Sequence, residues 1–176
     1  MSKEKEMFGL ATPTLTASSD VKIISNERNN VCNVIFKGLQ VSLNQESYPL
    51  NQVLVFSLEI PIKTEKTILG YIQDITFGVE RSKGTRVSMV FDLGSALHTI
   101  EYPFEANFTQ EPPEPAPLIV RRFFSPQGIE SANQDIFGLL GVKSYLATIY
   151  ISVQRKSCKD TAIVSVDGID IVAVLI

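Results

Sequence analysis

The 176-residue chain contains one histidine, His98, and two cysteines, Cys32 and Cys158. Nucleophilic catalysis by a Ser-His or Cys-His pair needs a histidine base, so such a site would have to include His98. His98 shares a face of the predicted strand LHTIEYPF with Ile100 and Tyr102, and no serine stands in a Gly-x-Ser-x-Gly turn. We therefore expect His98 to be a packed or edge side chain, and we predict no catalytic residue.

The pattern of possible ligands does not favour a metal or a cofactor. Cys32 and Cys158 lie outside any Cys-x-x-Cys or Cys/His cluster, and we interpret them as two buried free thiols. Asp167 and Asp170 in VDGIDI are too few for the alternating acidic ligands and closing glutamate of an EF-hand loop. No phosphate-binding glycine motif follows a predicted strand. The sequence therefore predicts no cofactor.

Acidic residues on the predicted strands could form the carboxylate pair that glycosidases use. The candidates are Asp74, Glu80, Asp92, Glu101 and Glu105. Almost any acidic sandwich offers as many. The chain has no tryptophan, which tells against a sugar-processing groove, although tyrosine and phenylalanine can also stack on sugar rings. We expect a protein that is not an enzyme.

Charge and composition exclude further classes. Sixteen Lys and Arg against nineteen Asp and Glu give a net charge of −3, which lacks the basic field of nucleic-acid binders. With 44% hydrophobic and 20% charged residues, the composition favours a folded domain over disorder. No window is apolar enough to span a membrane, and MSKEKEMFGL lacks the apolar run of a signal peptide. We expect synthesis and retention in the cytoplasm.

Most of the chain shows the two-residue alternation of half-buried strands. Apolar residues occupy every second position from Leu54 to Ile62, from Ile75 to Val79 and from Val87 to Leu93. In VCNVIFKGLQVSL the apolar phase changes at Lys37-Gly38, which predicts a bulge or a sharp bend there. These segments predict strands that each turn one face to a core.

Turn and helix signals complete the expected fold. RSKGTR reads as a hairpin loop with a positive φ at Gly84, and Asp167-Gly168 reads as the two-residue turn of a hairpin between TAIVSV and IDIVAVLI. Further strands are expected in LIVRRFF and YLATIYISVQR, and IESANQDIFGLLGV alone favours a short helix. The sequence therefore predicts an all-β, antiparallel, jelly-roll-like β-sandwich of about nine strands, with residues 21–176 as one domain.

Five of the nine prolines lie in QEPPEPAPLIVRRFFSPQG, residues 110–128. The stretch could be a domain linker, a polyproline ligand or an extended crossover between strands, and we favour the crossover because too little chain follows it for a second domain. Proline cannot donate to a strand ladder, so this stretch should lie at an edge or in a loop. Its candidate interface residues are Pro112, Pro113, Pro115, Arg121 and Arg122.

The first twenty residues sustain no period, and we expect an arm that is flexible or that lies on a neighbouring subunit. Phe8, Leu10 and Leu15 are the candidate anchors of such an arm. Together with the apolar C-terminus, the arm favours protein partners and a homo-oligomer or larger assembly.

The stretch from Ile68 to Phe104 resembles a module of bacteriophage virion structural proteins. An Ile-rich strand leads through a polar hairpin into a second strand, a small-residue turn and an Ile-x-x-Pro ending. The matching residues are Ile72, Ile75, Phe77, Val87, Met89, Gly94, Ile100 and Pro103. The resemblance implies a capsid-associated, tail or fibre-linked subunit. Our first hypothesis is thus a non-enzymatic structural subunit, and the alternative is a β-sandwich that binds a carbohydrate or a lipid surface.

Overall fold

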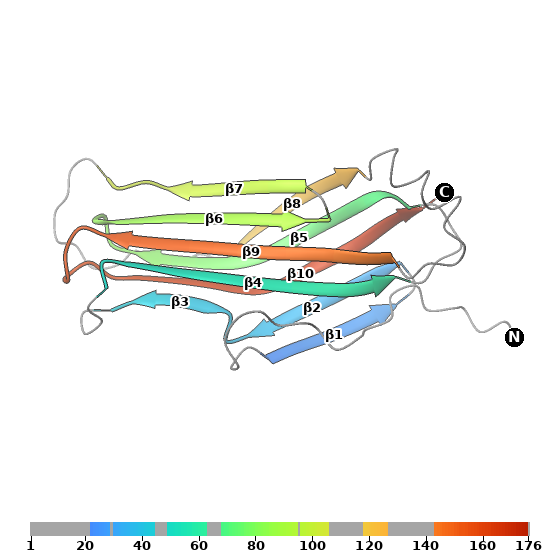
Figure 1. The fold of residues 1–176 in the computed structure, drawn as a ribbon, viewed down its shortest axis with the longest axis horizontal. Coiled ribbons are helices and arrows are strands. Elements are labelled where there is room, and N and C mark those ends of the chain that lie inside the picture. The colour runs from blue at the N-terminus through green and yellow to red at the C-terminus, as the bar shows by residue number, and fades with distance from the viewer. Residues whose placement is uncertain are drawn as a thin grey trace, which may run out of the picture.

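The structure is a computed structural model, and it describes residues 22–28, 30–44, 49–62, 68–94, 96–105, 118–126 and 143–175. These residues form ten strands and no helix (Figure 1). The strands are β1 (Lys22–Arg28), β2 (Val31–Lys37), β3 (Gln40–Leu43), β4 (Asn51–Ile62), β5 (Ile68–Arg81), β6 (Thr85–Leu93), β7 (Ala96–Tyr102), β8 (Leu118–Pro126), β9 (Lys143–Arg155) and β10 (Ala162–Leu175). The described part of the chain contains no helix that could cross a membrane.

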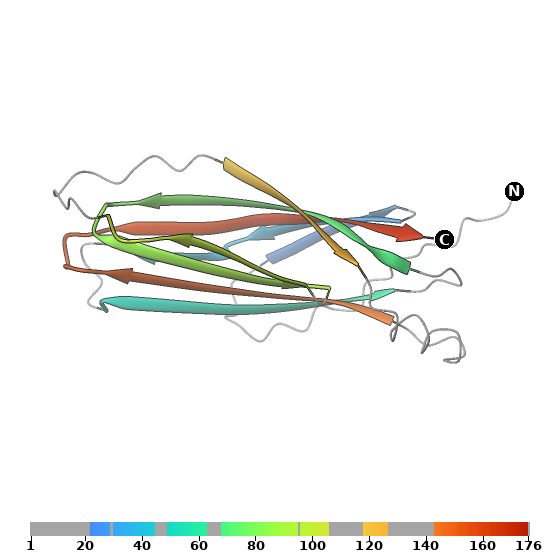
Figure 2. The same cartoon turned by 90° about the horizontal axis from the view of Figure 1, so that it is seen from above.

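The strands form two antiparallel sheets that pack as two layers (Figure 2). The six-stranded sheet has the order β1-β2-β10-β5-β8, with β3 also paired to β10, and the four-stranded sheet has the order β4-β9-β6-β7. From β3 onward, each strand lies in the opposite sheet from the strand before it, except that β7 pairs with β6. This alternation confirms the predicted jelly-roll-like sandwich.

The core lies between the sheets, where the predicted alternation places it. Phe56, Leu58 and Ile60 of β4 are buried, as are the odd-numbered apolar residues of β6 from Val87 to Leu93. The apolar residues before and after the phase change at Lys37-Gly38 are buried as well, including Phe36 on β2 and Leu39 just before β3. Each such side chain contributes roughly 1.5–3 kcal/mol when it leaves water, so the alternation determines which face of every strand turns inward.

The predicted bend at Lys37-Gly38 is confirmed. Gly38 has a φ of 85°, and the chain leaves β2 there to resume as β3 along the same neighbour, β10. The amide of Val166 in β10 donates to the carbonyl of Leu39 at 3.0 Å, which holds the break against the sheet. A glycine suits this position because other residues rarely adopt a positive φ.

The hairpin predicted at Asp167-Gly168 is wrong, because β10 runs through these residues as one continuous strand. The register with β5 passes from Val166–Phe77 directly to Gly168–Thr76, so Asp167 is the extra residue of a β-bulge. A Cβ atom on Gly168 would lie 2.6 Å from the carbonyl oxygen of Val34 on β2. The glycine therefore allows close approach of two strands and does not make a turn.

The hairpin predicted at RSKGTR is also wrong, since β5 and β6 belong to different sheets. The turn between them closes with a hydrogen bond from the Thr85 amide to the Ser82 carbonyl at 3.1 Å. Among the described glycines, positive φ values occur at Gly38 and Gly94 and not at Gly84. An i to i+3 turn of this kind needs no positive φ at its centre, so this part of the prediction fails with the hairpin.

The proline-rich stretch connects the two sheets. The strand before it, β7, is an edge strand of the four-stranded sheet, and β8, which lies within the stretch, is an edge strand of the six-stranded sheet, which confirms a crossover between sheets. Pro112, Pro113 and Pro115 themselves lie outside the described residues, as do the N-terminal arm and the whole of the predicted helix.

Candidate functional site

The structure separates the residues that a nucleophilic site would need. His98 lies opposite Phe91 in the middle of the β6–β7 pair, and its ring stacks on Phe123 of β8 at a centroid distance of 3.8 Å. Cys32 is buried on β2 in the other sheet, and Cys158 lies in the connection after β9, beyond the end of the strand. His98 is thus the edge side chain that the sequence predicts. It links the free edges of the two sheets.

The cysteine prediction is half right. Cys32 is a buried free thiol, whereas Cys158 is an exposed one. The exposure of Cys158 follows from its place in the turn that carries the chain from one sheet to the other.

Asp92 and Glu101, the two candidate acids on β6 and β7, lie too far apart for a glycosidase pair. Asp74 and Glu80 lie on β5 of the six-stranded sheet, whereas Asp92 and Glu101 lie on the four-stranded one. Glu101 is opposite Ser88, four residues along β6 from Asp92, which is about 13 Å at the usual rise per residue. That separation exceeds the roughly 5–9.5 Å of glycosidase carboxyl pairs. Within the described ranges, no three His, Cys, Asp or Glu side chains group closely enough to hold a metal ion.

One end of the sandwich holds a buried polar cluster that links its loops. Arg155 at the end of β9 is 4% exposed. Its guanidinium donates to the carbonyl oxygens of Asn44 at 2.7 Å, Pro49 at 3.2 Å, Asp160 at 3.2 Å and Cys158 at 3.3 Å. These acceptors lie in two loops, the β3–β4 connection and the β9–β10 connection, so the side chain holds the two loops together.

Two further buried groups complete this end cluster. Arg81 donates to the carbonyls of Thr85 at 3.1 Å and Pro103 at 3.2 Å, and it pairs with Glu105 at 3.4 Å. The carboxylate of Asp160 accepts from the hydroxyl of Ser82 at 3.0 Å and from the amide and hydroxyl of Ser157. Bonds to neighbouring loops thus satisfy these charges, and the cluster is structural.

Two of the predicted interface residues lie on the exposed surface of an edge strand. Arg121 and Arg122 are exposed on the edge strand β8, and Arg122 makes a two-pronged ion pair with Asp74 at 2.7 and 2.8 Å. This hydrogen bonding to Arg122 holds the pKa of the Asp74 carboxyl below its usual value. Phe8, Leu10 and Leu15 lie outside the described residues, so their part in an interface stays a prediction.

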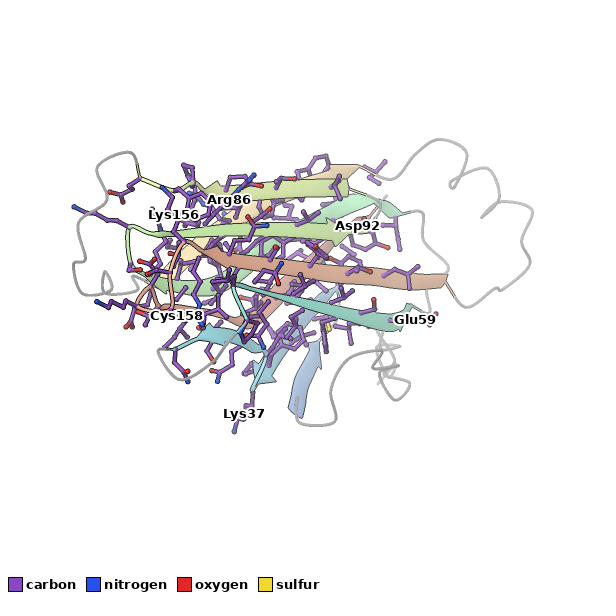
Figure 3. The ribbon with its side chains drawn as sticks, turned by 60° about the vertical axis from the view of Figure 1, so that its left-hand side comes forward. Lys37, Glu59, Arg86, Asp92, Lys156 and Cys158 are labelled. Atoms are coloured by element: carbon purple, nitrogen blue, oxygen red, sulfur yellow. The ribbon has the colours of Figure 1, made fainter. Side chains whose placement is uncertain are left out.

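A polar hollow opens on the outer face of the four-stranded sheet. It has a volume of about 190 Å³ and is lined by Arg86, Ser88, Tyr150, Ser152 and Gln154, and we call it the β6–β9 hollow. In the register of the two strands, Ser88 lies opposite Ser152 and Arg86 lies opposite Gln154. The two short serines leave space on the sheet, and the longer side chains stand around it. Figure 3 shows Arg86 on β6 toward one end of the strand and Asp92 toward the other.

A glutamate from the next strand orders the polar side of the hollow. Glu101 of β7 accepts a hydrogen bond of 2.6 Å from the Ser88 hydroxyl and pairs with the Arg86 Nε at 3.4 Å. The side chains of Arg86 and Glu101 are 48% and 41% exposed, so both remain in contact with solvent. Arg86 therefore keeps guanidinium N–H groups beyond the one that Glu101 occupies.

The other side of the hollow is apolar. Tyr150 is 38% exposed, and Val55 lies directly opposite it on β4. Val53, two residues earlier on the same face of β4, lies opposite Ser152 and is also exposed. The hollow thus combines an aromatic side chain, a short apolar margin and several groups that both donate and accept hydrogen bonds.

Sequence reasoning missed this site. Glu101 is one of the candidate acids, but Tyr150, Ser152 and Gln154 belong to no motif. The available signal was their common outward phase on β9, opposite the buried Ile149, Ile151 and Val153. That phase identifies a surface, but a hollow also requires the pairing of β9 with β6.

No family model matches the chain, and no curated protein matches its sequence. A solved structure of TmCBM61 in complex with beta-1,4-galactotriose is 12% identical, with a TM-score of 0.30 and coverage of 86% of this chain and 88% of that chain.

Proposed function

We propose that this protein is a non-enzymatic carbohydrate-binding module and that the β6–β9 hollow is its binding site. The observation that carries the proposal is the hollow itself, in which convergent polar side chains stand around two opposed serines next to an exposed tyrosine. Sugar recognition needs both parts, because hydroxyl groups exchange hydrogen bonds while the C–H faces of the ring need an apolar surface.

The donors and acceptors of the hollow suit hydroxyl groups. Gln154 supplies an amide that donates and accepts, Ser152 a hydroxyl that does both, and Arg86 further N–H donors. Tyr150 supplies an aromatic surface beside them. The separation of Asp92 from Glu101 supports binding without hydrolysis.

Glycan array binding followed by calorimetry tests the proposal. We expect wild-type protein to bind at least one glycan class, and Arg86→Ala and Tyr150→Ala each to weaken that binding about tenfold or more, as loss of a charged hydrogen bond or a ring contact does. Arg122→Ala is the matched control, because it removes an exposed arginine from the opposite sheet. The proposal fails if no glycan binds or if the control weakens binding as much as Arg86→Ala.

A structural-subunit role is the second candidate, and the exposed apolar residues of β8 favour it. Val120 and Phe124 are 55% and 56% exposed on either side of Arg122, on a strand that ends its sheet. Such a surface at a sheet edge is typical of contacts between copies of a chain. Light scattering behind a sizing column tests this role: we expect an oligomer that Phe124→Ser weakens and Leu146→Ser, a change on the other sheet, does not. A monomer at every concentration would overturn it.

A further inference from the structure

The charges in the β6–β9 hollow are already balanced. Arg86 and Glu101 are paired at 3.4 Å, and Arg86 is the one charged residue among the five that line the hollow. A charged ligand must therefore compete with Glu101 for Arg86, or with Arg86 for Glu101. A ligand without charge meets no such competition.

Glu101 is held firmly enough for this competition to matter. One of its carboxylate oxygens accepts from the Ser88 hydroxyl at 2.6 Å and the other faces Arg86. An acidic sugar that seeks Arg86 would approach this fixed carboxylate and be repelled by it. A sugar hydroxyl can instead use the remaining N–H groups of Arg86 and the amide of Gln154, which lies opposite Arg86 on β9.

The size and setting of the hollow limit how much of a ligand it holds. At about 190 Å³ it is smaller than the clefts of about 300–1,000 Å³ that enclose drug-sized ligands. It therefore accommodates one ring of a longer molecule. It also lies within the face of a sheet, with Val53 and Val55 of β4 on one side and Glu101 of β7 on the other, so a chain can continue beyond it in both directions.

From this charge balance and this open setting, we infer that the ligand is an internal stretch of an uncharged polysaccharide. A terminal sugar would instead need a closed pocket to recognise its end, and an acidic polysaccharide would need an unpaired cation. The inference rests on the proposed function and specifies the ligand of the same site.

Affinity electrophoresis tests the inference. Wild-type protein is run in native gels that contain an uncharged polysaccharide (glucan, galactan, mannan or xylan) or an acidic one (polygalacturonate or alginate). We expect at least one uncharged polysaccharide to retard the protein and the acidic ones to retard it at least fivefold less. For the best polysaccharide, its hexasaccharide should compete and its monosaccharide should not.

Glu101→Gln sharpens the test, because it leaves the charge of Arg86 without its partner. We expect this variant to gain retardation by polygalacturonate several-fold relative to wild type. Glu59→Gln is the matched control, since Glu59 lies on the same sheet near the far end of β4 (Figure 3), and we expect it to behave like wild type.

The outcomes separate the inference from the proposed function. Stronger retardation by an acidic polysaccharide, or equal competition by the monosaccharide, would overturn the inference and leave carbohydrate binding intact. A protein that no polysaccharide retards and that binds no glycan on the array would overturn both.

Discussion

Two arginines at neighbouring positions of one strand pair have opposite surroundings. Arg155 of β9 lies opposite Thr85, and Arg86 of β6 lies opposite Gln154, one step further along the same ladder. Because successive side chains point to opposite faces, Arg155 turns into the end of the sandwich and Arg86 turns outward into the β6–β9 hollow. The strand phase alone therefore separates two side chains of the same type.

The difference shows how to distinguish a structural charge from one available to a ligand. Backbone carbonyls from two loops surround Arg155, so its donors are used within the protein. Arg86 has one ion pair among the described residues, with Glu101, and half of its side chain is exposed. A fixed, satisfied guanidinium stabilises the fold, whereas a partly satisfied one at the surface can bind another molecule.

The largest expected loss of stability follows from replacing the buried Arg155. Arg155→Ala removes the donor that the carbonyls of Asn44, Pro49 and Asp160 share and leaves these acceptors without it inside the protein. We expect the free energy of unfolding, measured by urea denaturation, to fall by about 3–5 kcal/mol.

Arg155→Lys is the informative second variant, because it keeps the charge but loses the fork that reaches several carbonyls at once. We expect it to recover only part of the stability. A loss below about 1 kcal/mol for Arg155→Ala would show that the end cluster is not structural. Arg155 would then not differ from Arg86 in its contribution to stability.

The sequence predicts the phase of the strands from β2 to β7 because the alternation of side chains is a local property. Phe56 and Leu58 on β4, or Met89 and Phe91 on β6, need no knowledge of their neighbours to be assigned to the core. The bend at Gly38 is likewise a local signal, since the apolar phase changes within a few residues.

The connections could not be predicted in the same way. Whether RSKGTR turns back within one sheet or carries the chain to the other depends on which strands lie next to β5 and β6. β5 lies between β10 and β8, and β6 lies between β9 and β7, so most of these neighbours are distant in the sequence. Asp167-Gly168 suits a tight turn and a bulge equally well in sequence. The close approach of Val34 on β2 decides for the bulge.

The candidate site is also a product of long-range register. Ser88 and Ser152 form the floor of the hollow only because β6 and β9 pair with these residues opposite each other. A shift of one residue would turn every side chain of one strand to the other face. Sequence reasoning identified Glu101 as a possible acid but had no means of placing it beside Arg86.

His98 is partly buried, intermediate between the buried Arg155 and the exposed Arg86, and its protonation makes the stability of the fold depend on pH. Burial lowers the pKa of His98 below its usual value of 6.5, so the folded state binds fewer protons than the unfolded state as the pH falls through this range. Stability should therefore be constant above about pH 7 and decline as the pH falls below about 6.5.

The measurement is the urea midpoint between pH 7.5 and 5, a window above the range in which Asp74 and other carboxylates take up protons. His98→Phe keeps a ring to stack on Phe123 and cannot be protonated, so we expect it to remove most of the decline. An unchanged decline in the variant would show that His98 is not the group responsible.

The smallest expected effect on stability follows from replacing the exposed Arg86. Arg86→Ala removes an ion pair of 3.4 Å between two side chains that are both about half exposed, and such pairs contribute about 0–1 kcal/mol. We expect the unfolding free energy to change by less than about 0.5 kcal/mol, and a double-mutant cycle with Glu101→Ala to give a coupling of similar size. Ser88 retains Glu101 in the single variant, because its hydroxyl donates to the other carboxylate oxygen.

A loss of stability as large as that of Arg155→Ala would mean that the outer face is also required for folding. Any weakened glycan binding by Arg86→Ala would then reflect lost structure and not a lost ligand contact.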